Sequence, residues 1–171
     1  MAEILIVVGS ESGNARLVAE CVRDALARAG HGATLSTGQD CADLRLSERD
    51  LLLVCTSTHG NGDWPDNIAL FARSLDATRP DLSRLRYGVI ALGDRTYHDT
   101  FCRAGRRLDE ALHRLGATRL GERLEIDACE QPLPDEDALA WLQSWTALLN
   151  APAAHHNENN QYEETRRRRL S

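Results

Sequence analysis

The first segment that could bind a ligand is residues 10–15, with the sequence Ser-Glu-Ser-Gly-Asn-Ala. It follows the apolar run 3–8, and apolar residues recur after it at helical spacing, so the pattern predicts a turn between a strand and a helix. Unpaired N–H groups at the start of a helix attract anions, and serine and asparagine side chains add hydrogen bonds. We therefore expect a phosphate site, although serines that only cap the helix would produce the same pattern.

Two later segments have residues suited to contact with a flat ligand. Residues 56–67 (TSTHGNGDWPDN) contain glycines that let the backbone approach a ligand closely, and residues 92–102 (LGDRTYHDTFC) contain an aromatic ring that can stack. Other roles stay open for single residues: Trp64 could pack under its own loop, Tyr97 could be a surface aromatic, and His59 could be a capping side chain. The position of all three segments after predicted strands favours one shared binding site.

Strands and helices that alternate along the chain must position these segments. Apolar runs predict the strands, and apolar residues at helical spacing predict the helices. The expected strands cover residues 3–8, 33–37, 51–55, 87–92 and part of 118–128, and the expected helices cover residues 15–29, 66–77, 101–115 and 135–149. This alternation implies right-handed βαβ units, which make a doubly wound α/β domain with five parallel strands and helices on both faces. Ligands of such domains bind at the carboxyl ends of the strands, where the loops after the first, third and fourth strands would meet.

The chain has no lysine, because all 20 of its cationic residues are arginines. A P-loop needs the ending Gly-Lys-Ser/Thr, and a dinucleotide site needs Gly-x-Gly-x-x-Gly; neither motif occurs. A response-regulator receiver domain shares this topology, but its pattern includes an acid cluster and a lysine. A phosphate bound without lysine or metal is the environment expected for the monophosphate of FMN.

The charge balance argues against nucleic acid and anionic membranes as partners. Residues 1–150 contain 23 acidic residues and 16 arginines, a net charge of −7, which favours a basic protein partner. The N-terminal segment has an acid where a signal peptide needs cations, and its apolar run is too short to cross a bilayer. Five widely spaced cysteines without a Cys-x-x-Cys pair indicate reduced thiols and no metal centre. We expect a cytoplasmic protein with one domain, residues 1–150, and a disordered tail, residues 151–171.

The three polar segments resemble the flavodoxin family, and the resemblance covers about residues 3–149. Residues 10–15 resemble the phosphate loop of the family, while residues 57–67 and 92–102 resemble the second and third flavin loops in the FMN domains of diflavin reductases. The MioC type of short flavodoxin is most similar, because it also resembles the chain in residues 133–145. The resemblance implies FMN as the cofactor and a flavodoxin-like sheet with the strand order 2-1-3-4-5.

The resemblance also implies which residues contact FMN. Glu11 would contribute its backbone to the phosphate site, where Ala15 replaces the threonine of many flavodoxins. Tyr97 would cover the outer face of the flavin, and His59 occupies a position where many relatives place Trp or Tyr against the inner face. The implied set is Ser10, Glu11, Ser12, Gly13, Asn14, Ala15, Ser57, Thr58, His59, Gly60, Asn61, Gly62, Leu92, Gly93, Asp94, Tyr97, Asp99, Phe101, Cys102 and Asp127.

The implied activity is that of an electron carrier and not of an enzyme, because the flavin supplies the redox chemistry. The implied partners are a flavodoxin or ferredoxin NADPH reductase and acceptor enzymes that include biotin synthase. The chain itself is expected to be a monomer. Two alternatives stay open at this point. One is an FMN-dependent NAD(P)H:quinone oxidoreductase with the same fold, and the other is a binding protein that keeps the fold without the flavin.

Overall fold

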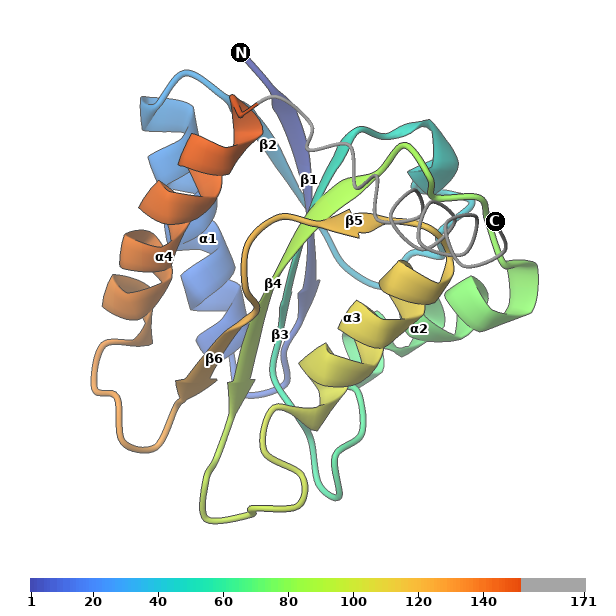
Figure 1. The fold of residues 1–171 in the computed structure, drawn as a ribbon. Helices are drawn as coiled ribbons and strands as arrows, with labels where there is room; N and C mark the ends of the chain where they lie inside the picture. Colours follow the sequence, from blue (N-terminus) through green and yellow to red (C-terminus); the bar gives the residue numbers. More distant parts are fainter. Residues whose placement is uncertain (152–171) are drawn as a thin grey trace, which may run out of the picture.

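A parallel β-sheet with helices on both faces makes up residues 1–151, the part of the chain that the computed structural model describes (Figure 1). The strand order is β2-β1-β3-β4-β5, and β6 also pairs with β4, so the predicted doubly wound order is confirmed. The strands are β1 (Glu3–Gly9), β2 (Gly32–Ser36), β3 (Leu51–Thr56), β4 (Arg86–Gly93), β5 (Thr118–Arg119) and β6 (Leu124–Asp127). The helices are α1 (Asn14–Arg28), α2 (Asp66–Thr78), α3 (Arg103–Arg114) and α4 (Pro134–Leu149), with a 3-10 helix at Leu46–Glu48. The tail predicted for residues 151–171 lies outside the described residues except for Ala151.

Alternating side chains along the strands build one hydrophobic core on each face of the sheet. In β1, Leu5 and Val7 belong to the core under α2 and α3, whereas Ile4, Ile6 and Val8 belong to the core under α1 and α4. Figure 1 shows the two helix pairs on opposite sides of the sheet. Burial on both faces explains why the central strands are continuous apolar runs in the sequence.

The apolar run near the N-terminus forms β1 in the middle of the sheet, between β2 and β3. Within residues 1–151, no helix combines the length and the apolar character that crossing a membrane requires.

The fifth strand, predicted as one strand within residues 118–128, is divided into two short strands. Tyr87 at the start of β4 is paired with Arg119 of β5, and Ile90 further along β4 is paired with Leu124 of β6. The N–H of Leu120 still donates to the carbonyl of Tyr87 over 2.8 Å, but the stretch of chain from Arg119 to Leu124 is longer than the stretch of β4 beside it, so residues 121–123 bulge out of the sheet.

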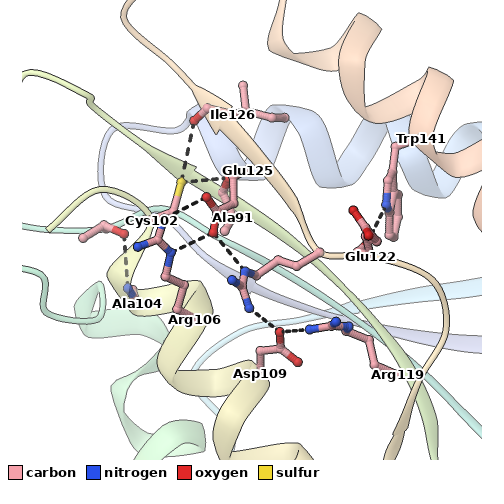
Figure 2. A network of polar contacts seen from close by, with 12 residues as sticks. Ala91, Cys102, Ala104, Arg106, Asp109, Arg119, Glu122, Glu125, Ile126 and Trp141 are labelled. Atoms are coloured by element: carbon pink, nitrogen blue, oxygen red, sulfur yellow. Dashed lines mark hydrogen bonds and ion pairs between the residues drawn. The ribbon is translucent and has the colours of Figure 1, made fainter. Parts of the chain in front are cut away.

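A buried carboxylate, Asp109, binds the arginines beside this bulge (Figure 2). Asp109 of α3 is 4% exposed and accepts hydrogen bonds from the Tyr87 hydroxyl (2.6 Å) and from Nη1 of Arg119 (2.5 Å). Arg123 also donates to Asp109, and through Nε it donates to Glu125 of β6 over 3.1 Å. A buried carboxylate is tolerated when it is paired and hydrogen-bonded, and Arg119 at the end of β5 and Arg123 at the end of the bulge provide this pairing.

Helix α3 begins later than the sequence pattern predicts. Phe101 was expected to start the helix, but Cys102 has a left-handed backbone conformation (φ 54°) and α3 begins at Arg103. Phe101 and Cys102 therefore end the loop that follows β4, and this loop is one of the three that carry the candidate site.

Candidate functional site

The loop after β1 leads to the N-terminus of α1, which has no side-chain cap. Gly13 precedes the helix in a left-handed conformation (φ 93°), and its N–H donates to the Ser10 hydroxyl over 3.0 Å. Residues 11–14 are exposed, and the first turn of α1 contains no acidic residue. Free N–H groups and the helix dipole suit this turn to a phosphate. Ala15 is fully buried, so only its backbone can take part.

Backbone hydrogen bonds fasten this first loop to the second loop, which follows β3. The N–H of Ser10 donates to the side-chain oxygen of Asn67 over 2.9 Å, and the N–H of Ser57 donates to the carbonyl of Gly9 over 2.8 Å. Asn67 was not among the predicted site residues, because an amide in the first turn of a helix has no distinctive spacing. The two loops are thereby held side by side at the carboxyl end of the sheet.

A side-chain contact also joins these loops. Nδ1 of His59 lies 2.6 Å from Oε2 of Glu11, and the two side chains are 59% and 36% exposed. The structure thus directs the imidazole of His59 toward the first loop. The resemblance implied a place beside the inner face of a flavin, and that role stays a prediction.

The second loop is a tight turn with one open face. The N–H groups of His59 and Asp63 each donate to the carbonyl of the other over 2.9 Å, and Gly60 (φ 49°) and Gly62 (φ 95°) turn the chain between them. No atom lies within 4 Å of the place that a β-carbon on Gly60 would occupy, whereas at Gly62 that place is filled by Arg103 of α3. A flat ligand can therefore approach the backbone at Gly60.

Asp94 organises the third loop, which follows β4. Its carbonyl accepts the N–H of Tyr97 (3.1 Å), and its Oδ1 accepts the N–H of Thr96 (2.8 Å). Hydrogen bonds from Thr96 hold the pKa of Asp94 below its usual range, so the carboxylate is charged at neutral pH. Tyr97 is 64% exposed, which leaves its ring available to a ligand.

A cavity of about 720 Å³ lies between the second and third loops, a volume typical of small-molecule sites. Six predicted site residues line it: Thr58, Gly60, Asn61, Asp94, Tyr97 and Asp99. Three other residues of the third loop line it as well: Thr96, His98 and Thr100. These three residues lie within segment 92–102, which the sequence indicated, but their residue types alone do not indicate contact with a ligand.

Three predicted residues lie in the core below the third loop. Leu92 and Cys102 are at most 1% exposed, and Phe101 is 9% exposed. The Cys102 thiol donates to the carbonyl of Ala91 (3.3 Å, Figure 2), and burial raises its pKa to about 12. The side chains of Leu92 and Cys102 are buried beneath the third loop, so a ligand could contact only the backbone of these two residues.

Asp127, the last residue of β6, lies beside the third loop. It is 7% exposed, and its Oδ1 accepts the N–H of Cys129 over 3.1 Å. The side-chain ligand atoms of Asp94, Asp127 and Cys129 lie within 4.8 Å of one another, and the carbonyl of Gly93 accepts the N–H of Ala128 (2.9 Å). A hydrogen bond to Asp94 raises the pKa of the exposed Cys129 thiol. The sequence did not point to Cys129, because a lone cysteine in a polar segment has no distinctive pattern.

Known proteins are similar to this chain over most of its length. The flavodoxin family model matches residues 6–141. Protein MioC of Escherichia coli (strain K12) is 41% identical over 149 residues, which are 87% of this chain and 99% of MioC. The chain belongs to the flavodoxin family. A further relative of this flavodoxin is the sulfite reductase [NADPH] flavoprotein alpha-component of Bacillus subtilis (strain 168), 36% identical over 149 residues, which are 86% of this chain and 24% of that protein.

A solved structure supports the same assignment. A mutant form of the flavodoxin from Pseudomonas aeruginosa superposes with a TM-score of 0.81 at 33% identity, covering 88% of this chain and 100% of that chain. The flavodoxin fold and the resemblance to short flavodoxins of the MioC type, both predicted from the sequence, are confirmed.

The cofactor of this flavodoxin is FMN, and the chain has features that fit it. The uncapped start of α1 suits a phosphate, the open face of Gly60 admits a flat ring, and the cavity between the loops has the volume of a small-molecule site. When bound, FMN supplies the capacity to accept and release electrons.

Proposed function

We propose that this flavodoxin carries single electrons from an NADPH-dependent reductase to acceptor enzymes, with FMN bound by its three loops. The observation that carries the proposal is the cavity of about 720 Å³ between the second and third loops. The family consists of electron carriers, so no residue of the site has to act as a catalytic acid, base or nucleophile.

The first loop binds the phosphate in this proposal. The first N–H groups of α1 and the hydroxyls of Ser10 and Ser12 donate to it, and Glu11 contributes its backbone. A helix dipole and several donors together replace the lysine that the chain lacks. The backbone of Ala15 completes the turn, because its side chain is buried.

The second and third loops enclose the ring. The edge of the flavin meets the backbone at Gly60, Asn61 and Gly62. The side chain of Tyr97, which is exposed in the structure, stacks on the outer face of the flavin. Gly93, Asp94, Asp99, Phe101, Cys102 and Leu92 form the wall at the other end, and Asp127 lies at the edge. The backbone of residues 57–59 continues this contact surface toward the first loop.

A reductase with a basic surface fits the charge of the chain. The net charge of −7 in residues 1–150 steers the protein toward a basic partner surface. The Bacillus subtilis relative, whose name includes NADPH, has a matching stretch within a longer protein. We infer that the present chain acts as a monomer and meets its reductase as a separate protein, and that biotin synthase is among its acceptors.

Reduction by partner proteins tests the proposal. The holoprotein is mixed anaerobically with NADPH and a basic flavodoxin reductase, and its visible absorbance is followed; it should be reduced only when the reductase is present. The rate should fall as salt rises, because the Debye length is only about 10 Å at 0.1 M. Reduced protein should then transfer electrons to biotin synthase. Steady-state quinone reduction with NADPH alone would contradict the proposal and favour a quinone oxidoreductase.

A further inference from the structure

The inner side of the second loop rests on helix α3. Nε1 of Trp64 donates to the carbonyl of Ala104 over 3.3 Å, and the N–H of Ala104 donates to the hydroxyl of Thr58 over 3.3 Å. Trp64 itself is partly buried against the core below α2 and α3. One residue in the first turn of α3 therefore bonds to both ends of the loop.

Two arginines of α3 add to this contact. The guanidinium of Arg107 lies over the ring of Trp64, 3.8 Å from its centroid, which is close for a cation–π contact. Arg103 donates through Nη1 to the carbonyl of Asn61 over 3.4 Å, and its methylene groups fill the space beside Gly62, where a β-carbon would come within 2.4 Å of Cδ. The buried face of the turn is thus packed against arginine side chains.

The turn cannot set its own orientation. The two hydrogen bonds between His59 and Asp63 close the turn, but they do not attach it to the sheet. On the open face, nothing lies within 4 Å of the place for a β-carbon at Gly60. Neighbouring elements therefore decide where the backbone at Gly60 and Asn61 stands relative to the cavity. The contact between His59 and Glu11 holds the turn on the side of the first loop, and the contacts with α3 hold its inner side.

We propose that Arg103 and Arg107 are positioning residues for the flavin ring: they hold residues 58–64 in the orientation that binds it, through Asn61 and Trp64, and neither of them lines the cavity. The inference rests on the proposed function of the second loop. The sequence left two roles open for Trp64, packing under its own loop or binding a ligand. The contacts with α3 assign it the packing role.

The test compares ring binding with phosphate binding. Dissociation constants of FMN and of riboflavin, which lacks the phosphate, are measured for the full-length protein and for Arg107→Leu, Arg107→Lys and Arg103→Leu. Arg107→Leu and Arg103→Leu should each weaken both ligands by the same factor, on the order of tenfold, because only ring contacts are disturbed. Arg107→Lys keeps a cation over Trp64 and should recover most of the affinity. Arg114→Leu is the matched control, since Arg114 lies on the same helix and pairs with Asp76 at the surface (3.6 Å).

Hydrogen exchange gives a second readout in the flavin-free protein. The amides of His59, Gly62 and Asp63, which are bonded within the turn, should exchange faster in Arg107→Leu while amides of β1 and β3 keep their protection. Should that variant fail to fold, Trp64→Phe removes the bond to Ala104 and serves in its place. Affinities and exchange rates equal to those of Arg114→Leu would overturn the inference. A parent protein that binds no FMN would instead refute the proposed function, while faster exchange in the turn would still support the contact with α3.

Discussion

The imidazole of His59 and the carboxylate of Glu11 form a contact between two loops, with Nδ1 and Oε2 2.6 Å apart. Glu11 is the one acidic residue of the first loop, residues 10–15, which we propose binds the phosphate of FMN. The pairing directs its negative charge toward the second loop. Because both side chains are partly exposed, the contact contributes at most about 1 kcal/mol.

Replacing His59 by Ala should weaken FMN binding by no more than ~5-fold, because the Glu11 carboxylate loses its partner beside the phosphate site. Glu11→Gln removes that charge, so the double substitution should bind FMN as the parent does. Titration of the flavin-free protein with FMN, followed by fluorescence quenching, measures each constant. A larger loss for His59→Ala than for Tyr97→Ala would mean that His59 covers the inner face of the flavin instead.

Tyr97→Ala should weaken FMN binding by about 1 to 3 kcal/mol, or roughly 5- to 150-fold, because it removes the exposed ring that stacks on the flavin. Tyr97→Phe should keep most of the affinity, since the ring stays. Leu148→Ala, which removes a partly exposed apolar side chain near the end of α4, is the control for general surface effects. Equal affinities for Tyr97→Ala and the parent would show that Tyr97 is a surface aromatic without a role in binding.

Much of the fold could be predicted from local patterns. The buried runs 3–8, 51–55 and 87–92 became β1, β3 and β4 because both faces of these strands are covered by helices. Polar loops after the first, third and fourth strands meet at one end of the sheet, since a parallel sheet brings its carboxyl ends together. The spacing of apolar residues and the turn residues were therefore enough to predict which three loops meet at this end of the sheet.

Contacts between distant residues could not be predicted in this way. The fifth strand is divided between Arg119 and Leu124, and the side chains of Arg119 and Arg123 both bond to Asp109, which lies on another element, α3. The pairing of His59 with Glu11 likewise depends on two loops that are separated along the chain. Side-chain partners of this kind follow from the assembled fold, and no local spacing indicates them.

The reactivity of Cys129 should depend on Asp94. The hydrogen bond and charge of Asp94 raise the pKa of this exposed thiol, so Asp94→Asn should lower that pKa and speed alkylation by iodoacetamide at pH 8. Peptide mass spectrometry over time separates Cys129 from the other cysteines. Cys55 and Cys102 are internal controls that should stay unmodified in the folded protein, because burial raises the pKa of each to about 12. An unchanged rate for Cys129 would mean that Asp94 does not act on it.

Glu125 should stabilise the fold above mildly acidic pH. Hydrogen bonds from Arg106 (2.7 Å and 2.8 Å, Figure 2) hold the pKa of Glu125 below its usual range. The pKa of a glutamate in the unfolded chain is about 4.3. When the pKa is lower in the folded protein, the ionised carboxyl stabilises the fold fully above the unfolded pKa, and this stabilisation is lost as the pH falls through the folded pKa. Glu125→Gln should therefore lower the free energy of unfolding at pH 6 by about 1 to 2 kcal/mol, and the difference from the parent should shrink toward pH 3. Urea unfolding at both values measures it, and a difference that does not change with pH would contradict the ion pair.

The central claim is that the three loops bind one FMN per chain, and the flavin content of the purified full-length protein tests it most directly. Visible absorbance and the mass of the released flavin are measured together, before and after incubation with excess FMN and desalting. We expect a yellow protein that holds one equivalent of FMN and retains it far more tightly than riboflavin, because the first loop binds the phosphate. A colourless protein that takes up no FMN, or one that holds FMN and riboflavin equally well, would contradict it.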